Sequence, residues 1–237
     1  MRSVAVIPAR GGSKRIPRKN IRLFAGKPMI AWSIQAALAS GVFEEVLVST
    51  DDVEIAEIAR SLGAQVPFMR PLDLSGDYIG LTPVVRHAIT WLCEAGRAPD
   101  LVTCAYPTAP FLRAEDLQSA CKAIEARSDV DYIVAVGSFS APVQRAIVGG
   151  KEGFLEFLWP EFALTRSQDL RHGFYDAGHF FVGRAGAFMR YSSALEGRAM
   201  PYVIPRMLCQ DIDTEEDWEH AASIFEYWQY RKEGGHR

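Results

Sequence analysis

The residues best suited to chemistry lie near the N-terminus, between Arg10 and Lys19. Five of these ten residues are Arg or Lys, although the whole chain of 237 residues carries a formal net charge of −3. Gly11 and Gly12 allow a tight turn with no Cβ near a ligand, and Pro17 prevents the segment from continuing as a helix. Exposed backbone N–H groups and several cations together suit a triphosphate.

A solvated basic loop is the alternative interpretation of this segment. We favour phosphate binding because the segment directly follows a buried apolar run, and ligands bind at the carboxyl ends of strands in open α/β sheets. The segment matches neither G-x-x-x-x-G-K-[ST] nor G-x-G-x-x-G. A Walker P-loop and a dinucleotide site, such as that of an NAD-dependent oxidoreductase, are therefore disfavoured.

Two aspartates near the end of the chain form a candidate metal site. Asp211 and Asp213 are separated by one residue, so their side chains point the same way if the segment is extended. They would hold Mg²⁺ together with phosphate oxygens and water. The alternative is that Asp213 only helps Thr214 to cap the last helix; a nearby triphosphate favours the metal. Asp51 is a weaker candidate for metal or nucleotide binding, and helix capping explains it equally well.

The elements that must position these residues alternate between short apolar runs and helical periodicity. The expected strands are Val4–Pro8, Glu45–Thr50, Leu101–Tyr106 and Tyr132–Gly137. The expected helices begin at Pro28, cover Ile55–Leu62, open at Thr82-Pro83 and cover Leu117–Ile124. Strands without polar alternation, separated by amphipathic helices, predict an α/β fold with a mostly parallel sheet sandwiched by helices.

Regularity is lost after residue 138 and returns near residue 200. Residues 138–185 carry no clear helix, and we expect strands and long loops there, as an irregular or antiparallel extension of the sheet. Met200–Ile204 is a further expected strand, and Thr214 is the expected N-cap of a final helix. With no repeat or linker, residues 1–237 are expected to form a single domain.

Composition narrows the function classes. The acidic balance excludes a globally basic nucleic-acid binder, and no apolar run approaches the roughly 20 residues that cross a bilayer. The first apolar stretch is too short for a signal sequence. We therefore expect a cytoplasmic protein with no nucleic-acid or membrane partner. The cysteines and histidines show neither zinc spacing nor a nucleophile arrangement.

Five ordered motifs carry a resemblance that covers nearly the whole chain. They are IPARGGSKRIPRKN, STDD, Arg70-Pro71 with Leu74-Ser75 downstream, YPTAPF and DIDT. Together they resemble the CMP–sialic acid synthetase family of cytidylyltransferases. Within it, Pro142–Arg145, Thr165–Leu170 and Asp176–Gly178 are most similar to the pseudaminic acid cytidylyltransferases.

The resemblance implies a Rossmann-like nucleotidyltransferase fold and Mg²⁺-dependent transfer of CMP from CTP to an acidic nine-carbon sugar, pseudaminic acid. It also implies a homodimer in which residues 138–185 of one subunit help to close the sugar pocket of the other.

The resemblance also implies residue roles, which complete those read from the cationic segment. The expected nucleotide-binding residues are Ala9, Arg10, Gly11, Gly12, Ser13, Lys14, Lys19, Asn20, Arg70 and Thr82. The expected catalytic residues are Arg10 and Lys19 with the metal ligands Asp211 and Asp213. The expected sugar-binding residues are Tyr106, Gln144, Arg145, Arg166, Gln168, Asp176, His179 and Phe181. Arg15 is expected to point outward.

Three positions depart from the family pattern. Tyr106 stands where sialic acid synthetases carry glutamine, and His179 and Phe181 stand where we expect glutamine and tyrosine in pseudaminate enzymes. N-acetylneuraminate, legionaminate and 3-deoxy-manno-octulosonate thus stay open as acceptors. A non-catalytic nucleotide-binding protein of this fold is the remaining alternative, but mere binding needs no metal aspartates beside the cationic segment.

Overall fold

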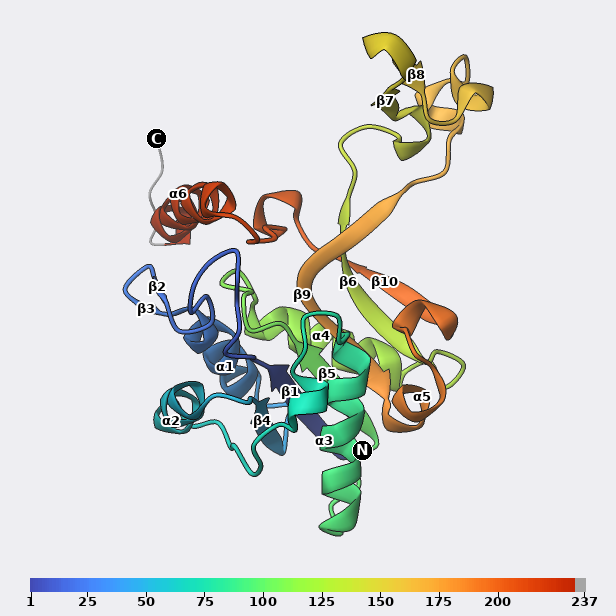
Figure 1. Ribbon diagram of the computed structural model, residues 1–237. Coiled ribbons are helices and arrows are strands. Elements are labelled where there is room, and N and C mark those ends of the chain that lie inside the picture. Colours follow the sequence, from blue (N-terminus) through green and yellow to red (C-terminus); the bar gives the residue numbers. More distant parts are fainter. Residues whose placement is uncertain (233–237) are drawn as a thin grey trace.

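The computed structural model describes residues 1–232 and is built around a six-stranded sheet (Figure 1). Its strands are β1 (Ser3–Pro8), β4 (Glu45–Ser49), β5 (Leu101–Ala105), β6 (Tyr132–Ser138), β9 (Phe174–Arg184) and β10 (Ala199–Val203). They lie side by side in the order β10-β6-β9-β5-β1-β4. The pairs β1–β4, β1–β5 and β10–β6 are parallel, whereas β9 runs antiparallel to both of its neighbours.

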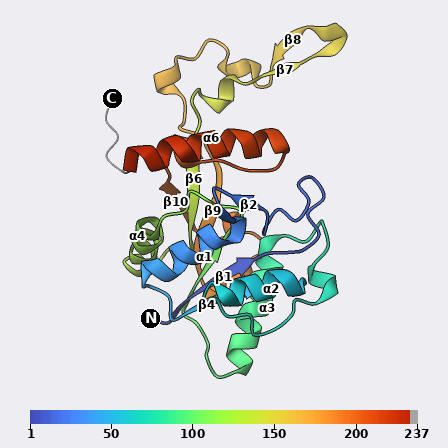
Figure 2. The same ribbon diagram turned by 90° about the vertical axis from the view of Figure 1, so that its left-hand side faces the viewer.

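Helices cover both faces of the sheet. They are α1 (Met29–Ser40), α2 (Val53–Ser61), α3 (Leu81–Glu94), α4 (Ala114–Glu125), α5 (Ala185–Arg190) and α6 (Glu215–Lys232). Because side chains alternate along a strand, Ala5 and Ile7 of β1 pack in one apolar cluster with residues of α1, α2, α4 and α6. Val4 and Val6 pack in a second cluster with residues of α3 and α5. Figure 2 views the molecule from the side of α1 and α2.

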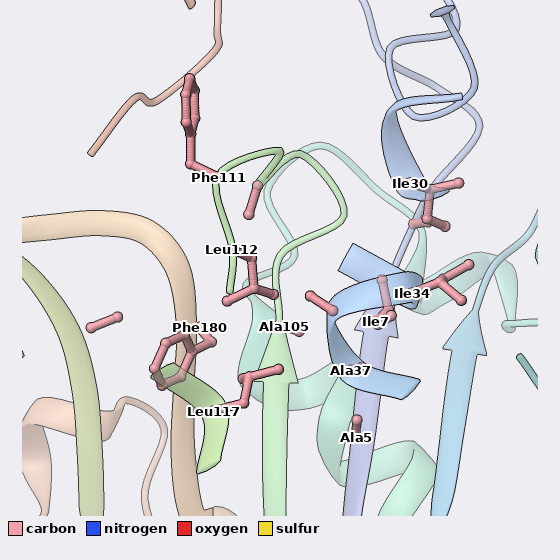
Figure 3. Close-up of a cluster of buried hydrophobic side chains, with 14 of the residues drawn as sticks. Ala5, Ile7, Ile30, Ile34, Ala37, Ala105, Phe111, Leu112, Leu117 and Phe180 are labelled. Atoms are coloured by element: carbon pink, nitrogen blue, oxygen red, sulfur yellow. The ribbon is translucent and has the colours of Figure 1, made fainter. Parts of the chain in front are cut away.

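The core explains why the expected helices form where they do. Ile30, Ile34 and Ala37 lie on one stripe of α1 and are buried, on the side of the helix that meets β1 (Figure 3). Pro28 precedes the first turn of α1, and Gly41 ends it with a φ of 65°, a conformation that suits glycine. The expected mostly parallel sheet between helices is confirmed.

The middle of the sheet differs from the sequence-based expectation. We assigned all of residues 138–185 to an extension, but β9 lies inside the main sheet between β5 and β6. Its residues Ala177 to Gly183 are buried, so they belong to the core. In such a fold, a core strand is usually recognised by the helical crossover that connects it to a parallel neighbour. An antiparallel strand needs no crossover, so the sequence around β9 lacks this sign.

Residues 139–173, which we call the lobe, project from the body beyond the ends of β6 and β9 (Figures 1 and 2). The lobe contains the antiparallel hairpin β7 (Ile147–Gly149) and β8 (Leu155–Phe157). Several of its large apolar side chains are exposed: Ile147, Phe154, Leu155, Leu158 and Leu164. A second short hairpin joins β2 (Leu23–Phe24) to β3 (Lys27–Pro28). Within residues 1–232, each helix is too short or too polar to cross a membrane.

Candidate active site

The cationic segment is fastened to the ends of the strands beside it. The N–H of Ala9 donates to the carbonyl of Ser49 at 2.9 Å, and the N–H of Gly11 donates to Oδ1 of Asp51 at 2.9 Å. A Cβ at Gly11 would lie 2.6 Å from Oδ2 of Asp52, so only glycine fits there. At Gly12 a Cβ would meet open space. Asp51 thus holds the segment, while its neighbour Asp52 caps α2.

A cavity of about 490 Å³ lies beside this segment, at the carboxyl ends of β1 and β5. Five cationic side chains line it: Arg10, Lys14, Arg15, Lys19 and Arg70. Ser13 and Asn20 also line it, and the side chain of Asn20 donates to the carbonyl of Arg10 at 2.9 Å. This concentration of positive charge suits a polyphosphate. Most of the expected nucleotide residues therefore lie at one cavity; Ala9 is buried beneath it, and Gly11 and Gly12 lie outside its lining.

Asp77 neutralises part of this charge. Its two oxygens pair with Arg10 and with Lys14, each at 2.5 Å. Hydrogen bonds from Lys14 and Arg10 lower the pKa of Asp77. A phosphate that binds Arg10 and Lys14 would compete with this carboxylate. No motif in the sequence marks Asp77, because the contact depends on how the 70–80 segment folds back over the loop.

Arg70 is a buried cation of this cavity, with 6% of its surface exposed. Its guanidinium donates to the hydroxyl of Ser49 at 3.1 Å and to the carbonyl of the same residue. The pKa of Arg70 is lowered to about 10, mainly by burial and in part by the nearby positive charge of Arg10. An anion in the cavity would stabilise these two neighbouring charges.

Lys19 links the cationic segment to the two aspartates. Its Nζ donates to the carbonyl of Ile212 at 2.6 Å and lies 3.3 Å from Oδ1 of Asp213. Ile212 is fully buried, and the aspartates on either side of it are not, as expected of an extended segment. Arg15 pairs with Asp213 at 2.8 Å, so the expectation that Arg15 points away from the site was wrong, although 66% of its side chain is exposed.

The capping alternative for Asp213 is contradicted. The hydroxyl of Thr214 accepts from the N–H of Asp217 at 3.2 Å, and the carboxylate of Asp217 accepts from the N–H of Thr214 at 2.8 Å. This reciprocal pair caps α6. The carboxylate of Asp213 instead faces Arg15 and Lys19.

Asp211 and Asp213 have the electrostatics of a cation site. Partial burial and the negative charge of Asp213 raise the pKa of Asp211. A divalent cation between the two carboxylates would relieve this repulsion, so the residues fit Mg²⁺. In the part of the chain that the structure describes, no three His, Cys, Asp or Glu side chains gather as metal ligands. The remaining ligands would therefore be phosphate oxygens and water.

A second cavity, of about 640 Å³, adjoins the first. Both are lined by Gly80, Leu81 and Tyr106. Three of the expected sugar-binding residues line it, namely Tyr106, Asp176 and Phe181. Thr82, expected at the nucleotide, lines this second cavity instead. The turn at Ser192–Leu195 also lines it and was not predicted, since it lies in an irregular stretch that carries no motif.

The other expected sugar residues lie elsewhere. His179 has 0% exposure, and its Nε2 is hydrogen-bonded to the carbonyl of Leu208 at 2.9 Å, so its expected contact with a sugar is contradicted. Gln144, Arg145, Arg166 and Gln168 are part of the lobe and line neither cavity. There Gln144 donates to the carbonyl of Arg171, and Arg166 pairs with Asp169.

Comparison with known proteins finds similar sequences over nearly the whole chain. A family model described as cytidylyltransferase matches residues 4–145. The chain is 41% identical over 226 residues to the pseudaminic acid cytidylyltransferase of Campylobacter jejuni, covering 95% of this chain and 97% of that protein. It is 26% identical over 221 residues to the N-acylneuraminate cytidylyltransferase of Escherichia coli, covering 93% of this chain and 51% of that protein.

Solved structures share the architecture. A CMP:2-keto-3-deoxy-manno-octonic acid synthetase in complex with CTP superposes with a TM-score of 0.69 at 17% identity, covering 96% of this chain and 99% of that one. A 4-diphosphocytidyl-2C-methyl-D-erythritol synthase from Anaerococcus prevotii superposes with a TM-score of 0.63 at 12% identity, covering 95% and 98%. At these identities the likeness establishes the nucleotidyltransferase fold alone.

Proposed function

The chain belongs to the cytidylyltransferase family, and from this premise we propose that it transfers CMP from CTP to pseudaminic acid, giving CMP-pseudaminate and pyrophosphate. The observation that carries the proposal is the pair of adjoining cavities that share Tyr106. One is lined by cations and suits a triphosphate, and the other is largely apolar and suits a deoxygenated sugar. An acceptor hydroxyl and an α-phosphate can therefore meet beside Tyr106.

The reaction needs positioning and charge stabilisation more than covalent catalysis. The anomeric hydroxyl of the sugar forms a bond to the α-phosphorus of CTP and gives its proton to solvent. The bond between the α-phosphorus and the oxygen of the β-phosphate breaks, and pyrophosphate leaves with the electron pair. Arg10 and Lys19 stabilise the negative charge on the transferred and leaving phosphates. Lys14, Arg70, Gly80 and Leu81 also line the first cavity, and we assign the two cations to the phosphates and the Gly80-Leu81 segment to the base.

Asp211 and Asp213 would hold Mg²⁺, consistent with the raised pKa of Asp211 and the proximity of both residues to Lys19. When bound, the ion supplies further positive charge for the triphosphate. Lys19 keeps the two aspartates beside the cationic segment through its bond to the carbonyl of Ile212.

The lobe supplies the remaining sugar contacts from a second copy of the chain. Gln144, Arg145, Arg166 and Gln168 lie outside both cavities of their own chain, while the lobe exposes a set of large apolar side chains. A homodimer would cover that apolar surface and bring the polar residues to the partner's second cavity. All four cysteines are free thiols, as suits the reducing cytoplasm, where we propose that the protein acts.

Pyrophosphate release from each of the four nucleoside triphosphates, with pseudaminate and Mg²⁺, tests this proposal. Of the four nucleotides, only CTP should support rapid pyrophosphate release. Omission of the sugar should abolish the release that CTP supports. Release that is independent of the sugar, or equal with all four nucleotides, would overturn it.

A further inference from the structure

The stretch from Gly76 to Gly80 forms part of the wall of the first cavity. Gly76, Asp77, Ile79 and Gly80 all line that cavity. The N–H of Ile79 donates to the carbonyl of Gly76 at 3.3 Å, which holds the stretch in a turn. Tyr78, between two lining residues, is fully exposed. The turn therefore carries one negative charge, that of Asp77, at the edge of a cavity lined by cations.

Asp77 is shared between two of these cations. Its Oδ1 lies 2.5 Å from Nη1 of Arg10, and its Oδ2 lies 2.5 Å from Nζ of Lys14. The hydrogen bonds from Lys14 and Arg10 lower the pKa of Asp77, so the carboxylate is charged at neutral pH. In the part of the chain that the structure describes, no other acidic side chain pairs with Arg10 or Lys14. Asp77 is therefore the counter-ion of both.

A polyphosphate would use the same two cations. Arg10 and Lys14 line the cavity, and Arg10 lies near the buried Arg70, so this part of the wall attracts anions. A phosphate oxygen that binds there either displaces the carboxylate of Asp77 or lies beside it. Two negative charges at such a separation repel each other. In both arrangements Asp77 weakens the binding of a polyphosphate.

This competition has a use after the transfer step. Pyrophosphate is held through its phosphates alone, and its retention would keep the next CTP from binding. When its contacts with Arg10 and Lys14 break, the pairs with Asp77 can form again, so the two cations exchange one anionic partner for another. Departure of the product then leaves neither cation without a counter-ion, which makes departure easier.

We propose that Asp77 is an internal counter-ion that competes with polyphosphate for Arg10 and Lys14 and thereby promotes release of pyrophosphate. The carboxylate takes no part in bond making, and its effect is on the affinity of the cavity for phosphate groups. This inference rests on the proposed function, because pyrophosphate is the product of that reaction.

Calorimetry of inorganic pyrophosphate binding at low ionic strength measures the competition without turnover. Asp77→Asn should lower the Kd of pyrophosphate about 3- to 30-fold, because exposed ion pairs are individually weak and two of them are removed. Asp77→Glu keeps the charge and should stay close to the unmodified protein. In steady-state turnover, Asp77→Asn should lower the inhibition constant of added pyrophosphate by the same factor. A merely structural role of Asp77 would weaken binding rather than tighten it.

Asp73→Asn is the matched control, because it removes the same charge from the neighbouring turn. Asp73 is exposed, lines neither cavity and forms no ion pair within residues 1–232. This variant should leave the Kd of pyrophosphate unchanged. Cytidine, which has no phosphate, should bind equally to the unmodified protein and to Asp77→Asn.

Unchanged or weaker pyrophosphate binding in Asp77→Asn, or an equal gain in Asp73→Asn, would overturn the inference even if the unmodified protein turns pseudaminate over. A gain confined to Asp77→Asn, in a protein that releases no pyrophosphate from CTP and sugar, would instead overturn the proposed function and leave the competition at Asp77 standing.

Discussion

Lys19 connects two parts of the chain that lie far apart in the sequence. It follows β1 closely, yet its ammonium group contacts the backbone between Asp211 and Asp213. Only 17% of its side chain is exposed, whereas 66% of the Arg15 side chain is exposed. The two cations therefore approach the same carboxylate from differently solvated positions, and their contributions should differ.

Lys19→Ala should lower turnover about 100-fold, because it removes a shielded charge at the transferring phosphate together with the contact to Ile212. Arg15→Ala should have a smaller effect, since exposed ion pairs are weak. Steady-state pyrophosphate release measures both. Small and equal losses of turnover in the two variants would favour the alternative interpretation, in which the cationic segment is a solvated loop that binds no phosphate.

Asp211→Asn and Asp213→Asn should each lower turnover about 10²- to 10³-fold, the usual loss for a group that stabilises transition-state charge. Both variants should keep the fold of the unmodified protein, because neither aspartate side chain is part of the core. Activity across a magnesium titration and the unfolding temperature check this. Near-normal activity of both variants at ordinary magnesium concentration would show that these aspartates are not metal ligands.

Some residue roles could be predicted and others could not, for a physical reason. The cationic segment and the two aspartates form local patterns next to elements that the periodicity predicts. His179 is different, because it lies only three positions after Asp176 and yet its ring turns into the core toward Leu208. Asp77 and Leu195 reach the cavities only through folding of irregular segments.

Among the elements, α2 shows how local chemistry supports the site. Asp52 caps this helix by accepting from the N–H of Ile55 at 3.0 Å, and Arg18 of the cationic segment pairs with the same carboxylate. The cap thus stabilises both the helix and the loop that packs against it through Gly11. The hydrogen bond from Arg18 lowers the pKa of Asp52.

Asp52→Ala should lower the free energy of unfolding by about 1 kcal/mol, the usual loss for an N-cap. The pKa of Asp52 in the folded protein is below the ordinary value of 3.8. The stabilisation that ionised Asp52 provides is therefore complete above pH 3.8 and is lost as the pH falls through the pKa of the folded state. Urea unfolding at neutral pH and at pH values below 3.8 measures the difference.

Two variants serve as references for this cap. Asp52→Asn keeps an acceptor for the helix N–H and should lose less stability. Glu54→Ala removes the other, more exposed partner of Arg18 and should be close to neutral. Equal losses in Asp52→Ala and Glu54→Ala would assign the effect to the ion pair rather than to the cap.

The elements themselves were largely predictable, apart from the centre of the sheet. Helices with one apolar stripe and strands of continuous apolar residues appear where the periodicity indicates. The position of β9 between β5 and β6 was not predictable, because pairing between distant segments leaves no local pattern. The short α5 was missed since its six residues cover fewer than two turns.

At the scale of the whole molecule, the proposed contact of the lobe with a second copy of the chain can be tested directly. Light scattering should give twice the chain mass of 26.3 kDa. Leu164, with 98% of its surface exposed, lies in the lobe, and Leu164→Asp should shift the protein toward the monomer and lower turnover while CTP still binds. Leu23→Asp, outside the lobe, is the matched control. A fully active monomer would contradict the dimer.

The most direct test of the central claim is a competition between acceptors. The unmodified protein is given limiting CTP, Mg²⁺ and equal concentrations of pseudaminate and N-acetylneuraminate, and the CMP-sugars are measured by mass spectrometry. Transfer to pseudaminate through an apolar second cavity predicts that CMP-pseudaminate predominates. Some CMP-N-acetylneuraminate is expected, because apolar contact alone rejects a hydroxylated analogue by only about 100-fold. An equal or larger amount of CMP-N-acetylneuraminate would contradict the assignment of the acceptor, and absence of both products would contradict cytidylyl transfer itself.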